Sequence, residues 1–273
     1  SDWSSDVCSS DLHGAFLSHG GRLWAFLGAF YGSRTRVHTR AYVLREEAGR
    51  WESKGTVVEG GFWPMAEPVR MSDGNWVMAG FVVGEGEPAA VAVSRGDDFT
   101  RWERVVIPRA AGLGTMWGES GVWVEGRSVM NVARYGAEAR ALVARSEDGG
   151  RRWSEMRASN LPMVTSKPYV GVLSTGQRFL IATTAADTGK RRAPLTIAVS
   201  RRGGRLLERV FRIRDAEMAG GARDSHARAN LAYPYAVERE GMLYVGYSNN
   251  GGRTGMNINS AEMAVIPVET LAV

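Results

Sequence analysis

Hydrophobic and polar residues alternate along short runs of this chain, and a turn sequence that contains glycine stands before each run. Such alternation is typical of strands with one buried face, and a polar residue followed by glycine favours a tight hairpin. No long stretch has helical periodicity, and we interpret residues 215–228 as a loop insertion rather than a helix. The pattern predicts an all-β protein. The turn sequences and the runs that follow them are HGGRLWAF, DGNWVMAG, EGRSVMNVAR, TGQRFLIATT and EGMLYVGYS.

These hairpins belong to a repeat. Trp51, Trp102 and Trp153 are spaced 51 residues apart. Each unit holds enough chain for about four short strands, which is the pattern of a β-propeller blade, a small sheet that packs on its neighbours around an axis. We expect five units in one domain without an internal linker. The predicted units begin near residues 13, 61, 115, 166 and 231.

The first twelve residues, SDWSSDVCSSDL, differ from everything that follows. They lack the basic and apolar regions of a secretory signal. Residues 6–12 back-translate to GAC GTG TGC TCT TCC GAT CT, which resembles the end of a common short-read sequencing adapter. We therefore interpret residues 1–12 as a translated adapter and residues 13–273 as the native domain, whose coding sequence continues upstream.

Composition narrows the class of function. Without the adapter segment the chain has no cysteine, and its formal net charge rises from +5 to +8, which favours acidic ligands. Only Lys54, Lys167 and Lys190 are lysines among 34 basic residues, and no dense basic run contains aromatic residues, so we expect no nucleic-acid partner. No apolar run reaches the length of about eighteen residues that a membrane span needs. No pair of histidines has metal-ligand spacing, so we expect neither a metal nor another cofactor.

One motif carries a family resemblance. The segment SEDGGRRW, residues 146–153, fits Ser-x-Asp-x-Gly-x-x-Trp and resembles the Asp box of sialidases and related propellers. SRGDDFTRW at 94–102 is similar to a degenerate copy, and SRRGG at 200–204 to a more eroded one. We expect Asp148 to accept backbone N–H groups in a turn, a structural role and not a catalytic one. The resemblance implies a six-bladed β-propeller of sialidase type that lacks its first blade, with about five blades present.

Polar residues recur near the start of the innermost strand of each predicted unit. They are His13, Glu67, Glu119, Lys167 and Tyr233, at positions where core-facing residues would normally be apolar. We expect this ring of residues at one mouth of the central channel, where it either forms a polar site or only hydrates the rim.

A hairpin gives Glu119 a partner. Glu119 and Arg134 lie seven and eight residues on either side of Gly126, so they should meet across the two strands. An arginine in this position keeps the carboxylate ionised and orients it. A purely structural salt bridge is the alternative.

The order and spacing of these motifs resemble the sialidase family from about residue 61 to residue 250. In that family three arginines bind the carboxylate of sialic acid, a tyrosine paired with a glutamate is the nucleophile, and an aspartate is the acid/base. The resemblance implies that Tyr233 is the nucleophile and Glu119 its partner base. It implies that Arg134 and Arg192 are the second and third arginines of the carboxylate site.

Two of these assignments stay open at the level of the sequence. Tyr235 competes with Tyr233 in the segment YPY, and Arg191 competes with Arg192. The first arginine and the acid/base aspartate of the family belong to the missing first blade. Arg34, Arg36 and Arg40 are not their substitutes, because we expect a solvated strand and turn there.

The resemblance implies an exo-glycoside hydrolase, similar to a neuraminidase, that acts on a terminal acidic sugar of a glycan. We expect Glu67, Lys167, Tyr235 and Asn249 to contact the substrate, and we expect Asn250 near the mouth beside Asn249. Because Lys167 and Asn249 are not sialidase hallmarks, another acidic or sulfated sugar is an alternative. A non-catalytic glycan-binding propeller is the alternative from a different class. The family is commonly exported, which favours a secreted or periplasmic location over the cytoplasm, and the truncated chain is expected to be inactive.

Overall fold

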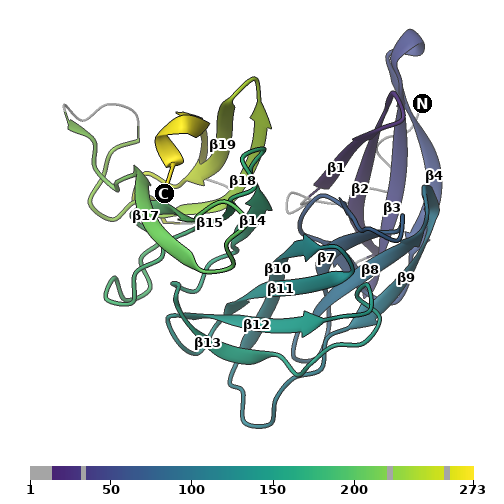
Figure 1. Cartoon of the computed structure of the whole chain (residues 1–273), viewed down its shortest axis with the longest axis horizontal. Helices are drawn as coiled ribbons and strands as arrows, with labels where there is room; N and C mark the ends of the chain where they lie inside the picture. Colours follow the sequence, from purple (N-terminus) through teal and green to yellow (C-terminus); the bar gives the residue numbers. More distant parts are fainter. Residues whose placement is uncertain (1–13, 32–34, 220–223, 255–258) are drawn as a thin grey trace. The chain divides into compact units, whose positions relative to one another are not determined.

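The secondary structure consists almost entirely of β-strands (Figure 1). The computed structural model of the chain describes residues 14–31, 35–219, 224–254 and 259–273. Within these ranges the strands form five sheets. In four of them neighbouring strands follow sequence order, whereas in the second sheet the first two strands both pair with the third. Two short 3-10 helices lie in the described residues, η1 (Glu46–Ala48) and η3 (Val268–Leu271).

The sheets are as follows. The first contains β1 (Gly14–His19), β2 (Arg22–Tyr31), β3 (Thr35–Arg45) and β4 (Arg50–Val58). The second contains β5 (Phe62–Pro64), β6 (Val69–Arg70), β7 (Trp76–Val82), β8 (Ala89–Arg95) and β9 (Asp98–Val106). The third contains β10 (Met116–Glu125), β11 (Ser128–Tyr135), β12 (Arg140–Ser146) and β13 (Arg157–Pro162). The fourth contains β14 (Tyr169–Val172), β15 (Arg178–Ala182), β16 (Leu195–Ser200) and β17 (Leu207–Arg214). The fifth contains β18 (Leu231–Arg239), β19 (Met242–Asn249) and β20 (Ser260–Pro267).

The predicted repeat is confirmed. The first strands of the sheets begin at residues 14, 62, 116, 169 and 231, each within three residues of its predicted start. Sequential strands in small sheets are the arrangement of propeller blades, so the all-β class and the five units agree with the prediction. The sixth blade stays a prediction, and residues 1–12 together with His13 lie outside the described residues.

The hairpin turns also lie where the sequence predicts them. Gly126 between β10 and β11 has φ 64°, and Gly241 between β18 and β19 has φ 73°. These values fall in the left-handed region, which glycine enters without a steric penalty. Strand pairing begins beside the second turn, where Arg239 faces Met242. The described parts of residues 215–228 contain no α-helix, as expected for a loop insertion.

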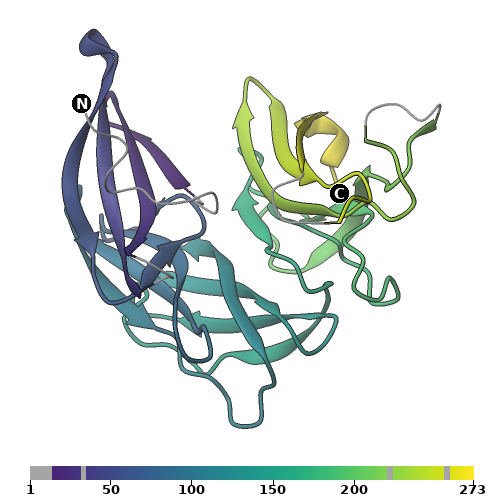
Figure 2. The same cartoon turned by 180° about the vertical axis from the view of Figure 1, so that it is seen from behind.

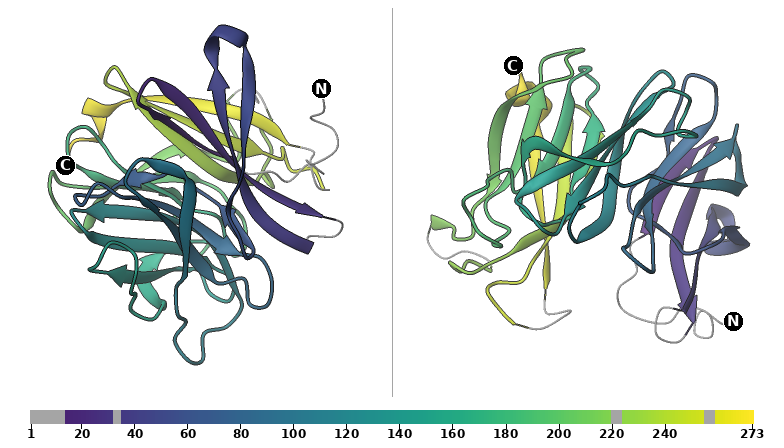
Figure 3. Two further views of the ribbon diagram at one scale, coloured as in Figure 1. Left: turned by 90° about the vertical axis from the view of Figure 1, so that its right-hand side faces the viewer. Right: turned by 90° about the horizontal axis from the view of Figure 1, so that it is seen from below.

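The chain divides into two compact units, and each unit has its own apolar core. In the first unit the core includes Phe26 of the first sheet and Phe62 of the second, both fully buried. In the second unit it includes Ile181 of the fourth sheet and Val245 of the fifth. The twist of the individual sheets can be followed in Figures 2 and 3. The first unit comprises residues 1–131 and 143–157, and the second comprises residues 132–142 and 158–273.

The Asp box braces the turn between β12 and β13. The Ser146 hydroxyl donates to Asp148 Oδ1 over 2.9 Å and accepts the N–H of Gly150 at the same distance. Asp148 Oδ1 also accepts the backbone N–H of Arg152 at 2.8 Å, and its Oδ2 pairs with Arg152 Nε at 2.7 Å. The side chain of Arg152 holds the pKa of the Asp148 carboxyl well below its usual range. Asp148 therefore has the structural role that we expected.

The degenerate copy at residues 94–102 repeats part of this geometry. Trp102 Nε1 donates to the carbonyl of Phe99 over 3.0 Å, and Trp153 Nε1 donates to the carbonyl of Gly150 over 2.8 Å. Both bonds span three residues. The two turns therefore share the same bond between the indole and a backbone carbonyl. No helix in the described residues is long and apolar enough to cross a membrane.

Candidate functional site

A polar cavity of about 310 Å³ lies in the second unit, where the fourth and fifth sheets contribute their connecting segments. It brings together two of the predicted site residues, Arg192 and Tyr233. The guanidinium carbon of Arg192 lies 5.9 Å from the centroid of the Tyr233 ring. The full lining is Lys190, Arg192, Asn230, Ala232, Tyr233, Ser248, Asn250 and Asn259.

A β-bulge directs Tyr233 into this cavity. Ala232 faces Ser248 on β19, but the next registered pair is Tyr235 with Gly246, so two residues of β18 oppose one of β19. Pro234 has no N–H for the ladder, which makes it suitable for a bulge. Tyr233 itself has φ 52°, a left-handed conformation that a non-glycine residue rarely adopts. Strained backbone of this kind concentrates at functional sites.

The bulge also separates the two competing tyrosines. Along a regular strand, side chains two residues apart share a face. The extra residue breaks this rule, so that Tyr233 lines the cavity while the ring of Tyr235 packs on Tyr169, with centroids 5.0 Å apart. Tyr235 is half-buried and packs against the apolar core of the second unit.

Backbone hydrogen bonds fix the position of Arg192. Its N–H donates to Asn230 Oδ1 over 2.9 Å, and its carbonyl accepts the N–H of Leu231 at 2.8 Å. The side chain is half-buried. The neighbouring Arg191 is exposed, and its guanidinium donates to the carbonyl of Ala227. Of the two arginines, Arg192 is the one that faces the cavity.

Two asparagines connect the segments that line the cavity. The N–H of Asn230 donates to Asn250 Oδ1 over 2.8 Å, and the N–H of Asn250 returns a bond to the carbonyl of Asn230 at 3.3 Å. On β19, the Ser248 hydroxyl donates to the carbonyl of Ala232 over 3.1 Å. These bonds hold the segment before β18 against the end of β19, so the cavity is preformed.

The charge of the lining is positive. Lys190 and Arg192 contribute two cations, and no aspartate or glutamate is among the described residues of the lining. The remaining polar groups are amides and hydroxyls. A cavity with this lining suits an anionic ligand that also carries hydroxyl groups.

Two other predicted residues of the second unit have buried positions. Lys167 is only 3% exposed, and its Nζ lies 5.9 Å from the centroid of the Tyr169 ring. Asn249 is fully buried and donates from Nδ2 to the carbonyl of Asp224 and to Glu262 Oε1, each over 3.0 Å. Asn249 thus lies behind the cavity, whereas the adjacent Asn250 lines it.

Glu262 stands at the centre of the network behind the cavity. Burial acts to raise the pKa of its carboxyl, but hydrogen bonds from Asn249 and Tyr247 and the ion pair with Arg214 hold that pKa below its ordinary value. Arg214 Nε lies 3.1 Å from Glu262 Oε2, and the Tyr247 hydroxyl lies 2.9 Å from the same oxygen. The network joins β17, β19 and β20 and keeps the end of β19 in place.

The predicted acidic residues lie in the first unit. Glu119 is buried in β10, with 8% of its surface exposed, and Glu67 is half-buried between β5 and β6. Arg134 belongs to β11, the neighbour of β10 in the third sheet, and its Nε donates to Thr165 Oγ1 over 3.1 Å. The pairings of Glu119 with Arg134 and with Tyr233 stay predictions. In the described residues, no group of three or more His, Cys, Asp or Glu side chains could hold a metal ion.

Sequence reasoning missed Lys190 and Asn230, two of the residues that line the cavity. Asn250, which also lines it, was expected near the mouth of the channel together with Asn249. The sequence position of Asn230 could have indicated its role, because it directly precedes the strand that contains Tyr233. For Lys190 the sequence offers only its position beside the arginine pair.

Comparison with known proteins identifies the architecture. The profile of the BNR repeat-like domain matches residues 12–245. A protein of unknown function from Dyadobacter fermentans is 12% identical, with a TM-score of 0.67, over 92% of this chain and 75% of that chain. The Hadza microbial sialidase Hz136 is 13% identical, with a TM-score of 0.67, over 96% of this chain and 53% of that chain. The α-L-arabinanase of Penicillium chrysogenum, complexed with arabinobiose, is 14% identical, with a TM-score of 0.60, over 97% of each chain. No curated protein matches the sequence. The chain spans about half the length of the sialidase, and these likenesses concern the fold.

Proposed function

The chain belongs to the BNR repeat-like domain family, and from this premise we propose that it is an exo-acting glycoside hydrolase that releases a terminal acidic sugar, such as sialic acid, from glycans. Proteins of similar fold include a sialidase and an arabinanase, which supports glycoside hydrolysis as the class of reaction. The choice of an acidic sugar rests on this chain's own residues.

The observation that carries the proposal is the charge of the cavity beside Tyr233. Its described lining has two cations, Lys190 and Arg192, and no carboxylate. A planar guanidinium can donate two parallel hydrogen bonds to a sugar carboxylate. A neutral sugar would make no use of the positive charge of these two side chains. The lining therefore favours an acidic sugar over a neutral one.

Tyr233 supplies the nucleophile in the proposed reaction. Sialic acid carries its carboxylate on the anomeric carbon, where a carboxylate nucleophile would be repelled and a phenol would not. Glu119 accepts the phenolic proton, the tyrosine oxygen bonds to the anomeric carbon, and the bond to the leaving oxygen breaks as that oxygen takes a proton from solvent. Water then attacks the anomeric carbon and loses a proton to solvent, the tyrosyl–sugar bond breaks, and the tyrosine oxygen takes its proton back from Glu119, which releases the sugar. Arg134 provides a further cation for the carboxylate.

The test is Tyr233→Phe in the protein as its source organism produces it. Hydrolysis of 4-methylumbelliferyl N-acetylneuraminide should fall by at least about a thousandfold, as expected when a nucleophile is removed. Binding of N-acetylneuraminic acid, measured by isothermal titration calorimetry, should change by less than about twofold, because the phenylalanine keeps the ring beside Arg192.

Tyr235→Phe is the matched control, since it removes the same hydroxyl from a tyrosine that packs against the core outside the cavity. Its turnover should match that of the unmodified enzyme. Unchanged turnover in Tyr233→Phe overturns Tyr233 as the nucleophile. Binding of the sugar without any hydrolysis by the unmodified protein would favour the non-catalytic glycan-binding alternative. Hydrolysis of neutral arabino-oligosaccharides and not of the sialoside would overturn the acidic-sugar assignment.

A further inference from the structure

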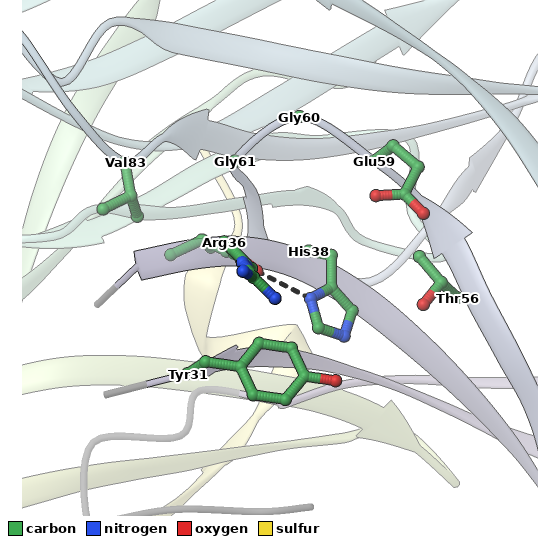
Figure 4. Close-up of a pocket in the computed structure, with 9 residues that line it drawn as sticks. Tyr31, Arg36, His38, Thr56, Glu59, Gly60, Gly61 and Val83 are labelled. Atoms are coloured by element: carbon green, nitrogen blue, oxygen red, sulfur yellow. Dashed lines mark hydrogen bonds between the residues drawn. The ribbon is translucent and has the colours of Figure 1, made fainter. Parts of the chain in front are cut away.

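A second cavity of about 500 Å³ lies in the first unit, at the end of the first sheet where β2 and β3 are joined (Figure 4). None of its residues was predicted to have a function. Its volume falls within the range of small-molecule sites, about 300–1,000 Å³. The lining comprises Tyr31, Arg36, Val37, His38, Thr56, Glu59, Gly60, Gly61 and Val83.

The walls of this cavity are held in place. The N–H of Gly61 donates to the carbonyl of Val37 over 2.8 Å, and the N–H of Val83 donates to the carbonyl of Gly61 over 2.9 Å. Val37, which is part of the lining, also packs in an apolar cluster with Trp63 and Met65. A polar surface with this support can present its groups in fixed positions, as a binding site requires.

His38 presents an acceptor to the cavity. The ring is only 8% exposed, and Nδ1 lies 2.8 Å from the carbonyl oxygen of Arg36. Because a carbonyl can only accept, Nδ1 must carry the proton, which leaves Nε2 of the neutral ring with its lone pair. No described residue hydrogen-bonds to Nε2. In Figure 4 this nitrogen points away from Arg36, into the space between Tyr31 and Thr56.

Tyr31 supplies an aromatic surface. Its side chain is 51% exposed, and its ring stacks on His38 with centroids 5.9 Å apart and planes tilted by 28°. The guanidinium carbon of Arg36 lies 6.0 Å from the centroid of the same ring. Arg36 has φ 53°, a strained conformation for a non-glycine residue and one that concentrates at binding sites. An exposed aromatic face beside polar groups suits a ligand with both C–H and hydroxyl surfaces.

The charges in this cavity balance, unlike those of the cavity beside Tyr233. Arg36 contributes a cation and Glu59 an anion, and neither forms an ion pair with another described residue. In Figure 4 the Glu59 carboxylate points toward the side of the cavity where His38 and Thr56 lie. The Glu59 carboxylate would repel an anionic ligand, and the Arg36 guanidinium would repel a cationic one. A neutral polyol can donate to Glu59 and His38 and accept from Arg36 at the same time.

We propose that this cavity binds a neutral saccharide. The sugar ring lies on Tyr31, its hydroxyls donate to the Glu59 carboxylate and to His38 Nε2, and Arg36 donates to its oxygens. The site does not depend on the proposed hydrolysis, because its residues take no part in that reaction. The protein would hold an acidic sugar at Arg192 and a neutral sugar at Tyr31.

The test is ligand-observed saturation-transfer NMR on the 273-residue chain, with lactose, maltose, cellobiose and xylobiose as probes. At least one probe should bind in the millimolar range or more tightly. Titration calorimetry with that probe should give binding weakened by at least about tenfold in Tyr31→Ala and in Glu59→Gln. Both side chains are exposed, so the variants should fold, and thermal melting checks this. Phe16→Ala, which removes an exposed aromatic ring of the same sheet outside the cavity, should bind as the unmodified chain does.

Three outcomes overturn the proposal. No probe binds, or binding is unaffected by both Tyr31→Ala and Glu59→Gln, or the cavity prefers an anion. The last case is tested in an Arg192→Ala background with N-acetylneuraminic acid, where Glu59→Gln would strengthen the binding of an anion and weaken that of a neutral sugar. Retention of neutral-sugar binding in Arg192→Ala separates this site from the proposed hydrolytic site.

Discussion

Tyr233 illustrates how a single residue can depend on a local irregularity. A regular strand would place it on the same face as Tyr235, against the apolar core. The bulge at Pro234 and the left-handed backbone of Tyr233 instead direct its ring beside Arg192. The strained conformation costs roughly 1–3 kcal/mol at such a residue. Hydrogen bonds of Asn230 and Ser248 hold the chain on the N-terminal side of the bulge.

The two adjacent arginines allow a matched test at the same scale. Arg192→Ala should weaken the binding of N-acetylneuraminic acid to the 273-residue chain by at least about tenfold, because a charge-assisted hydrogen bond contributes about 1.5–3 kcal/mol. Arg191→Ala should leave the affinity within about twofold of the unmodified chain, since Arg191 is exposed and bonds to Ala227 instead. Titration calorimetry measures both. Equal losses in the two variants would mean that bulk positive charge, and not Arg192, binds the sugar.

At the scale of the elements, the sheets depend on close backbone approach. Gly118 in β10 donates its N–H to the carbonyl of Glu87 over 2.9 Å. A Cβ atom at this position would lie 2.5 Å from the backbone nitrogen of Ala89 and 2.6 Å from the oxygen of Glu87. Because the crowding atoms belong to backbone, no side-chain rotation can relieve them. The approach of β10 to the segment before β8 therefore requires glycine.

Gly118→Ala should destabilise the protein by roughly 1–3 kcal/mol, the usual effect of overpacking a well-filled site. Gly246→Ala is the matched control in another strand, because the nearest atom to its added Cβ is 4.0 Å away. That variant should change the free energy of unfolding by less than about 0.5 kcal/mol. Urea denaturation followed by tryptophan fluorescence measures both variants. Similar stabilities for the two would contradict the close approach of β10.

At the scale of the whole molecule, the net charge of the chain says little about the charge inside each cavity. The chain has 34 basic and 29 acidic residues, a small surplus. Many exposed basic residues are engaged in surface ion pairs such as Arg201 with Glu208 and Arg253 with Asp224. Pairs of this kind contribute little to stability, with a median of about 0–1 kcal/mol. The local composition of each cavity, and not the net charge, therefore decides which ligand it favours.

Salt should consequently separate the two ligand classes. Raising the NaCl concentration from about 50 mM to about 500 mM shortens the screening length and should weaken the binding of N-acetylneuraminic acid several-fold. The affinity for the neutral disaccharide should stay within about twofold, since its contacts involve no net charge on the ligand. Titration calorimetry at the two salt concentrations checks this. A neutral sugar whose binding fell as steeply as that of the acidic sugar would contradict the assignment of the two cavities.

Features that depend on residues close in sequence could be predicted. The five units, the glycine turns and the Asp box at Ser146 and Asp148 follow from alternation, turn chemistry and hydrogen bonds between near neighbours. These forces act within a hairpin and leave a periodic trace in the sequence. The all-β class and the positions of the blades were determined in this way.

The tertiary structure alone decided which member of each competing pair reaches the cavity. Tyr233 and not Tyr235 lines it because of a bulge, and Arg192 rather than Arg191 because of the bond to Asn230. The saccharide cavity around Tyr31 was missed for a related reason, since its lining comes from segments that meet only when β3 and the segment after β4 fold together. Strand register and side-chain direction are set by packing across elements, and a shift of one residue exchanges the core face for the exposed face. The sequence by itself therefore determined the scaffold, and the packing of that scaffold determined the sites.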